Sequence, residues 1–132
     1  SVCCINSHNA PYCFSCYYAF NAADALLYFK SSADTTHSRS LEQNPQIAGT
    51  ILPDKLVKLT TRGIQFTGTL LQENDLQHQE AGKRYYQKFP LAHAVPGHIY
   101  TIRLDSIKMT DSTLGFGKKI LWTREQAIQT NQ

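Results

Sequence analysis

The four cysteines are the first residues whose type and spacing could do chemistry. They form an adjacent pair, Cys3 and Cys4, and a second pair, Cys13 and Cys16, with the C-x-x-C spacing of zinc and redox sites. The residues around the second pair, from Tyr12 to Phe20, are aromatic and strand-forming. In a β-strand, neighbours and residues three apart point to opposite faces, so neither pair can chelate a metal by its local geometry. We therefore expect buried or half-buried free thiols, with a metal site or a disulfide as the alternatives.

Other candidate motifs for a site are weaker. The histidines are dispersed and form no H-x-x-x-H or H-E-x-x-H motif; they are His8, His37, His78, His93 and His98. The chain has no nucleophile elbow, no Walker-type phosphate loop and no dinucleotide fingerprint. The segment Leu114–Lys119 combines two glycines with two lysines, and it either cradles a phosphate or forms a turn between strands. The sequence predicts no metal site.

Hydrophobic periodicity and turn residues predict short strands and two helices, which must position any site. The predicted strands are Val2–Asn6, Tyr12–Phe20, Ala25–Ser31, Gln46–Leu52, Leu56–Gln72, Ile99–Met109 and Lys118–Thr123. The first two form a hairpin around the turn from Asn6 to Pro11, and Gly63 is predicted to mark a bulge or bend. The strand Ala25–Ser31 has too few polar residues for a solvated face, so we expect it in the core.

The two predicted helices differ in length. A short helix is capped by Asp34 or Thr35, runs through Leu41 and ends at Asn44-Pro45, because the residue before proline disfavours helical geometry. A longer helix, capped by Asn74 or Asp75, runs from Asp75 to Phe89. Many strands with only two helices predict a small, mainly β antiparallel barrel, with an OB-fold as the structural rival.

Length and charge restrict the class of protein. The 132 residues correspond to one domain, 1–132, and no apolar run approaches the ~20 residues of a membrane span. The net charge of +3 comes from scattered residues and is too mild to indicate nucleic-acid binding. We therefore expect a cytoplasmic protein with neither membrane nor nucleic-acid partners. The chain starts at Ser1 in a strand-like run without Met, so we expect an N-terminal segment to be missing.

Three segments resemble the FMN-binding split barrels, the pyridoxamine 5'-phosphate oxidase-like superfamily. Leu26–Ser32 followed by Thr35–Gly49 is similar to the flavin-phosphate segment, in which a strand ends in Ser or Thr, a short helix follows, and Asn-Pro precedes the next strand. Arg62–Gly68 resembles the strand that comes after it. Asp105–Arg124 is similar to the C-terminal signature of the uncharacterised bacterial YhbP-like branch.

The resemblance implies a mainly β fold with minor α: a six- or seven-stranded antiparallel split barrel with one short and one longer helix. It also implies FMN held at the interface of a homodimer, with the ring against backbone of the second and third strands. The cofactor-binding residues implied by the resemblance are Ser15, Cys16, Tyr17, Lys30, Ser31, Thr35, Thr36, His37 and Gln65. The simpler interpretations are that Thr35 caps a helix, that Gln65 is an exposed strand residue, and that Tyr17 is a core or dimer contact.

One departure from the family's pattern concerns the phosphate. Where the family's enzymes carry an Arg-Lys pair, this chain has Thr36 and His37. A histidine near its ordinary pKa of about 6.5 is mostly neutral at pH 7, so the affinity for FMN is expected to fall. Either Lys30, Arg39, Arg62 or the Lys118-Lys119 pair compensates, or each of these residues is a solvated surface charge.

The sequence therefore supports two functional hypotheses and leaves a third weaker. The first is a flavin-binding protein, as an FMN-dependent oxidoreductase with an unknown substrate and no identified catalytic residue. The second is a non-catalytic dimeric module of the same fold that holds haem or another small ligand, or that has an empty site and serves only as an interaction protein. For haem, His37, His93 or His98 would supply the axial ligand. The third, an OB-type single-strand binder, has only Tyr100 and Arg103 in its favour.

Overall fold

The computed structural model describes residues 1–55, 57, 59–115 and 118–125. The described strands are β1 (Val2–Ile5), β2 (Pro11–Phe14), β3 (Tyr18–Asn21), β4 (Leu26–Ser31), β5 (Gln46–Ile51), β6 (Arg62–Leu70), β7 (His98–Asp111) and β8 (Lys119–Thr123). The helices are α1 (Thr36–Gln43) and α2 (Ala81–Lys88), with 3-10 turns η1 (Leu76–His78), η2 (Pro90–Ala94) and η3 (Ser112–Leu114). None of the helices in this part of the chain is long and apolar enough to span a bilayer.

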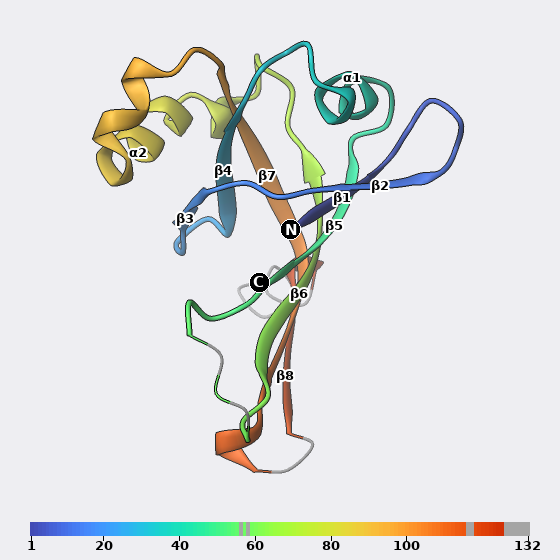
Figure 1. The fold of residues 1–132 in the computed structure, drawn as a ribbon, viewed down its shortest axis with the longest axis vertical. Coiled ribbons are helices and arrows are strands. Elements are labelled where there is room, and N and C mark those ends of the chain that lie inside the picture. Colours follow the sequence, from blue (N-terminus) through green and yellow to red (C-terminus); the bar gives the residue numbers. More distant parts are fainter. Residues whose placement is uncertain (56, 58, 116–117, 126–132) are drawn as a thin grey trace.

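All strand pairs are antiparallel and belong to one sheet in the order β2-β1-β5-β6-β7-β4-β3, with β8 also pairing with β7. The first half of β7 pairs with β4 and its second half with β8. The sheet therefore has a broad body that carries both helices and a narrower arm formed by β6, β7 and β8 (Figure 1). This confirms the predicted mainly β, antiparallel fold with two helices.

The strand β4 lies in the core and is buried on both faces. Leu27 and Phe29 belong to the larger apolar cluster, together with Leu41 of α1 and Ile102 of β7. Leu26 and Tyr28 face the opposite way and pack in a second cluster against Ala81 and Tyr85 of α2. The two-sided apolarity of this strand predicted this position correctly, because alternate residues of a strand project to opposite faces.

Two predicted strands and one predicted helix are wrong in extent. The run Tyr12–Phe20 is divided into β2 and β3, which pair with different strands, so the described sheet has eight strands rather than six or seven. The helix Asp75–Phe89 is divided too: Asp75 caps only η1, and α2 begins at Ala81, where the first buried apolar side chain occurs. Leu76 is 78% exposed, so no packing holds the first part in a longer helix.

The predicted strand Leu56–Gln72 corresponds to β6, which begins at Arg62; Leu56 and Lys58 lie outside the described residues. The bulge is not at Gly63. The register of β6 against β7 shifts between Thr67 and Gly68. A side chain at Gly68 would meet the carbonyl oxygen of Arg103 at 2.7 Å, so the close approach of β7 requires glycine at this position.

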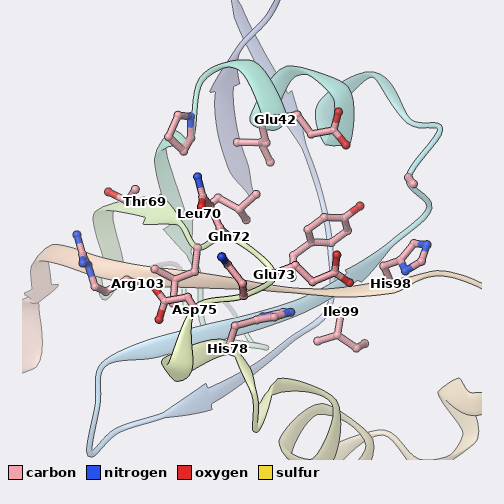
Figure 2. A pocket seen from close by; sticks show the side chains of 16 residues that line it. Glu42, Thr69, Leu70, Gln72, Glu73, Asp75, His78, His98, Ile99 and Arg103 are labelled. Carbon is pink, nitrogen blue, oxygen red and sulfur yellow. The ribbon is translucent and has the colours of Figure 1, made fainter.

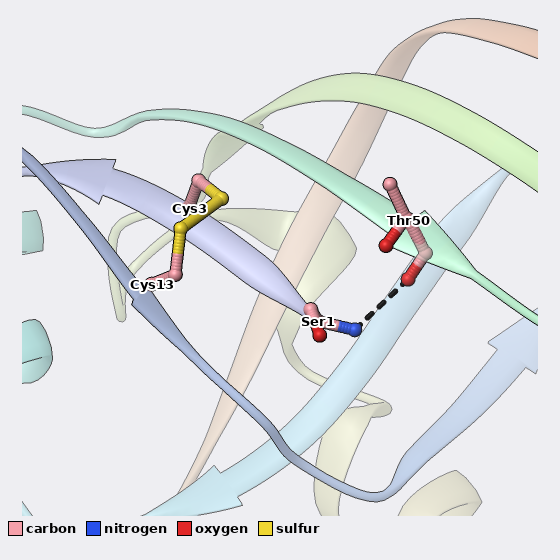
Figure 3. The surroundings of a disulfide bond; sticks show 4 residues. All are labelled: Ser1, Cys3, Cys13 and Thr50. Carbon is pink, nitrogen blue, oxygen red and sulfur yellow. Dashed lines mark hydrogen bonds between the residues drawn. A yellow bond between two sulfur atoms is a disulfide. The ribbon is translucent and has the colours of Figure 1, made fainter.

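The expectation of four free thiols is wrong for two of them. Cys3 and Cys13 form a disulfide across the β1–β2 hairpin, where they lie directly opposite each other with Cα atoms 4.2 Å apart (Figure 3). Cys4 and Cys16 are free, and burial raises the pKa of both thiols. The prediction considered geometry within each sequence pair, whereas cross-strand pairing in the predicted hairpin joins one cysteine from each.

This disulfide is expected to stabilise the hairpin that carries Phe14. It closes a loop of 10 residues in sequence, for which restriction of the unfolded chain contributes roughly 2–3 kcal/mol. Adding a thiol reductant should therefore lower the free energy of unfolding, measured by urea denaturation, by about this amount. The Cys3→Ser/Cys13→Ser variant should be insensitive to the reductant, and equal stability of the wild type with and without reductant would contradict the assignment.

Candidate functional site

The start of α1 is organised by hydroxyl groups. Thr35 is the N-cap, and its side chain accepts a hydrogen bond from the backbone N–H of Ser38 at 3.2 Å. The buried Ser38 hydroxyl donates to the carbonyl oxygen of Ser32 at 2.8 Å. Of the two caps proposed from the sequence, the structure has Thr35. Its hydroxyl is therefore part of the helix cap, whereas Thr36 is exposed at the first helical position.

His37 lies in a fixed, half-buried position between two strands. Its ring stacks on Phe14 of β2, with centroids 3.8 Å apart and planes 10° apart. Its Nε2 is 2.7 Å from the hydroxyl oxygen of Ser31 at the end of β4. Burial lowers the pKa of His37 below its ordinary value, so the imidazole is neutral at pH 7. The structure thus brings Ser31 and His37 together as a pair of neutral hydrogen-bonding groups.

Lys30 precedes Ser31 in β4 and points away from α1. Its ammonium group donates to the carbonyl oxygen of Ala92 at 2.7 Å and to that of Val95, and it lies 4.9 Å from the ring centroid of Tyr86. Adjacent residues in a strand project to opposite faces, which explains why Ser31 contacts α1 and Lys30 contacts η2. Lys30 is neither a solvated surface charge nor a group directed at the start of α1. Its hydrogen bonds connect β4 with the segment that follows α2.

Three of the predicted site residues lie in the segment between β2 and β3, and their side chains have different surroundings. Ser15 is exposed, and Cys16 is half-buried at the edge of a core cavity of about 170 Å³. Tyr17 is 79% exposed, and its ring centroid lies 6.0 Å from that of Phe89. Tyr17 is therefore a surface aromatic rather than a core residue.

Gln65 is remote from the other predicted residues within one chain. It is exposed in β6 and pairs with Lys108 of β7, whereas Lys30 pairs with Ile99. These two β7 positions are nine residues apart, which corresponds to roughly 30 Å along a strand. One chain cannot bring Gln65 and Ser31 to the same small ligand.

A cavity of about 640 Å³ lies beside the end of β4 and is mainly apolar. Three predicted site residues, Tyr17, Lys30 and Ser31, are on its border. The other lining residues are Ser32, Tyr85, Lys88, Phe89, Pro90, Leu91, Ala92, Val95 and Pro96. Sequence reasoning missed the contribution of η2, although the exposed apolar residues Leu91 and Val95 in a proline-bracketed loop were a signal for it. Its size and composition are typical of a site for a small organic ligand.

A second cavity, of about 680 Å³, lies between α1, η1 and the start of β7, and none of the residues predicted to bind FMN lines it (Figure 2). Carboxylates line it, from Glu42, Glu73 and Asp75. Its arginine, Arg103, forms an ion pair with Asp105 at 3.6 Å. Within the described part of the chain, no group of three or more His, Cys, Asp or Glu side chains could hold a metal ion. This cavity therefore presents excess negative charge.

Two further basic residues, Lys88 and Arg62, have partners, whereas Lys83, Arg84, Lys118 and Lys119 are exposed. Lys88 donates to the carbonyl oxygen of Tyr18 at 2.7 Å and lies 4.7 Å from that ring's centroid. Arg62 pairs with Asp111 at 3.3 Å, and hydrogen bonds from Thr113, together with Arg62, lower the pKa of that carboxyl group. Arg39 is exposed on α1 and forms no ion pair with a described residue. Phe116 and Gly117 of the glycine-lysine segment lie outside the described residues.

Comparison with known proteins places the chain in a family. No protein-family model matches it. It is 38% identical over 121 residues to the UPF0306 protein plu4501 of Photorhabdus laumondii, covering 92% of this chain and 85% of that protein. The chain belongs to the UPF0306 family. It is also 33% identical over 126 residues to the UPF0306 protein YhbP of Salmonella schwarzengrund, covering 96% of this chain and 86% of that protein. The resemblance to the YhbP-like branch is thereby confirmed.

Solved structures show that this member of the UPF0306 family has the split-barrel fold. A heme binding protein from Mycobacterium smegmatis matches with a TM-score of 0.73 and 14% identity, covering 94% of this chain and 52% of that one. A FAD-binding protein from Mesorhizobium loti has a TM-score of 0.66 and 15% identity, covering 83% and 81%. A pyridoxamine 5'-phosphate oxidase-related, FMN binding protein from Nostoc punctiforme has a TM-score of 0.65 and 10% identity, covering 93% and 78%. The split barrel, rather than the OB-fold, is the architecture.

The residues at the end of β4 fit a planar organic ligand but do not fit the phosphate of FMN. The cavity supplies apolar and aromatic walls, including Tyr17 and Phe89. The groups at the start of α1 are a hydroxyl used as a cap and a neutral histidine paired with Ser31. A phosphate dianion is usually bound by fixed cations. The two lysines that border the cavity are directed to backbone carbonyl groups, and Arg39 is the one basic residue of α1.

The environment of His37 predicts its titration. Its pKa, measured by NMR, should lie below about 6.5, and Phe14→Ala should raise it by removing the ring that desolvates the imidazole. The folded state then binds fewer protons at this site than the unfolded state. The contribution of His37 to stability is fully present above about pH 6.5 and decreases as the pH falls through the depressed pKa. An unshifted pKa in the wild type would contradict this geometry.

Proposed function

We propose that the protein is a homodimeric flavin-binding protein in which the cavity beside the end of β4 holds the flavin ring. The observation that carries this proposal is that Tyr17, Lys30 and Ser31, which the family resemblance implied as cofactor-binding residues, border a single apolar cavity of about 640 Å³. The flavin, when bound, supplies the electron-transfer chemistry of an oxidoreductase. The chain's own residues bind the ring, orient it and exclude water.

The lining residues support a planar aromatic ligand. Tyr17 and Phe89 present ring surfaces at the border of the cavity, and Lys88 lies 5.3 Å from the centroid of Phe89. Leu91 and Val95 add apolar surface that is 89% and 59% exposed in a single chain. Covering such surface with a ring removes apolar area from water, which favours binding. Two of the structural neighbours are a FAD-binding protein and an FMN binding protein, which agrees with this class of ligand.

Haem is less well supported by the three candidate axial histidines. His37 is hydrogen-bonded to Ser31, and His93 stacks on Tyr86 with centroids 3.7 Å apart. His98 borders the acidic cavity instead. We therefore propose a flavin rather than haem.

A second copy of the chain is part of the proposal because Gln65 lies too far from the cavity in one chain. The arm and the segment after β5 expose large apolar side chains, which we call the arm surface. They are Leu52, Val57, Leu59, Ile120 and Leu121, each 52–95% exposed, with the neighbours Ile120 and Leu121 on opposite faces of β8. An apolar surface of this kind is typical of a protein–protein interface. A partner that covers it could also bring its own Gln65 to the site.

Substitution of Tyr17 tests the ring site. Tyr17→Ala should weaken flavin binding, measured by quenching of flavin fluorescence, by roughly three- to tenfold because a stacking surface is lost. The matched control is Tyr12→Ala, which removes an exposed tyrosine from β2 that does not border the cavity. Equal affinities of the two variants would refute this location, and a Soret band in the purified protein would favour haem.

Substitution of the arm surface tests the dimer. Leu121→Lys should convert a species of twice the chain mass into one of a single chain mass in light scattering, because a charge is placed in the interface. Leu76→Lys, at an equally exposed leucine on η1, is the control and should leave the mass unchanged. A wild-type protein that is monomeric at micromolar concentration would rule out the proposed homodimer.

A further inference from the structure

The charges around the start of α1 specify what kind of flavin side chain the proposed site accepts. This inference rests on the proposed function and concerns the end of the ligand that leaves the ring cavity. Ser31 and Ser32 border the cavity and lead directly to α1, so a chain attached to the ring reaches the hydroxyl groups of this segment. The question is whether that end carries a phosphate.

The two lysines that border the cavity are already bound to the protein. Lys30 donates to two carbonyl oxygens of the η2 region, and Lys88 donates to one carbonyl oxygen of β3 while it lies over two aromatic rings. These bonds use two of the three N–H donors of Lys30 and one of those of Lys88, and they hold both ammonium groups beside η2 and β3. Neither lysine is therefore directed at the start of α1.

The helix start itself does not carry positive charge. His37 is held neutral, stacked on Phe14 and paired with Ser31. From Ser31 to Glu42 the chain has one basic residue, Arg39, and two acidic residues, Asp34 and Glu42, which leaves a net charge of −1. The neighbouring cavity adds the carboxylates of Glu73 and Asp75. Within this segment a dianion therefore finds Arg39 as its one basic side chain, together with the partial positive charge of a short helix.

A polyhydroxyl chain meets suitable groups at the same place. Thr36 offers an exposed hydroxyl at the first helical position, and Ser31 and Ser32 offer hydroxyls at the edge of the cavity. Hydroxyl groups both donate and accept hydrogen bonds, so they match sugar-alcohol hydroxyls without requiring a counter-charge. We propose that this site takes a flavin whose side chain ends in hydroxyl groups, as in riboflavin, rather than a phosphate monoester as in FMN.

The test compares two ligands that differ only in the phosphate. Riboflavin and FMN are titrated into the purified protein, and the dissociation constants are obtained from fluorescence quenching and calorimetry. Riboflavin should bind at least as tightly as FMN, and the ratio of the two constants should change little with salt, because no ion pair to phosphate is formed. FMN binding tenfold or more tightly than riboflavin would overturn the inference while supporting the proposed function.

Variants on α1 locate the effect. Thr36→Arg restores a cation at the exposed first position and should tighten FMN at least about fivefold with riboflavin unchanged. Gln43→Arg places the same charge at the exposed far end of α1 and should change neither constant. If Arg39→Gln weakens FMN but not riboflavin in the wild-type background, Arg39 binds the phosphate and the inference fails. If neither flavin binds to the wild type, the proposed function fails with it.

Discussion

Burial of β4 on both faces is the constraint on which the rest of the structure depends. One face packs into the larger cluster with α1, and the other packs against α2. Packing on both faces of β4 therefore positions both helices relative to this one strand. The loop that leads to α1 and the segment that follows α2 both lie at the C-terminal end of β4. The side chains of the last two residues of β4 also project to opposite faces. Ser31 contacts His37 on the α1 side, and Lys30 contacts the carbonyl oxygens of η2 on the other side. The candidate site is a direct consequence of this alternation.

The same alternation decides the electrostatics of the site. It directs the ammonium group of Lys30 away from α1 and leaves the helix start with neutral hydrogen-bonding groups. The β1–β2 hairpin, joined by its disulfide, presents Phe14 to the His37 ring, and the resulting burial lowers the pKa of that histidine. The chain thus combines an apolar cavity with a helix start whose first residues, Thr36 and His37, carry no fixed cation.

Much of the fold could be predicted from the sequence, because several local sequence patterns indicate the same elements that tertiary packing stabilises. Apolar residues on both faces placed β4 in the core, and Asn44-Pro45 ended α1. The disulfide was missed although its hairpin was predicted, since it depends on register between strands rather than on spacing within one. The different contacts of the adjacent residues Lys30 and Ser31 could have been predicted, because neighbouring residues of a strand project in opposite directions. The distance of Gln65 depends on how far β7 extends beyond β4, which no local pattern encodes.

The most direct test of the account is the absorption spectrum of the protein purified from its own cells, with mass spectrometry of the compound released on denaturation. The account predicts the two-band visible spectrum of a bound flavin and the release of a flavin without a phosphate. It further predicts that this flavin binds again to the purified protein. A Soret band, or the release of FMN as the bound species, would contradict it.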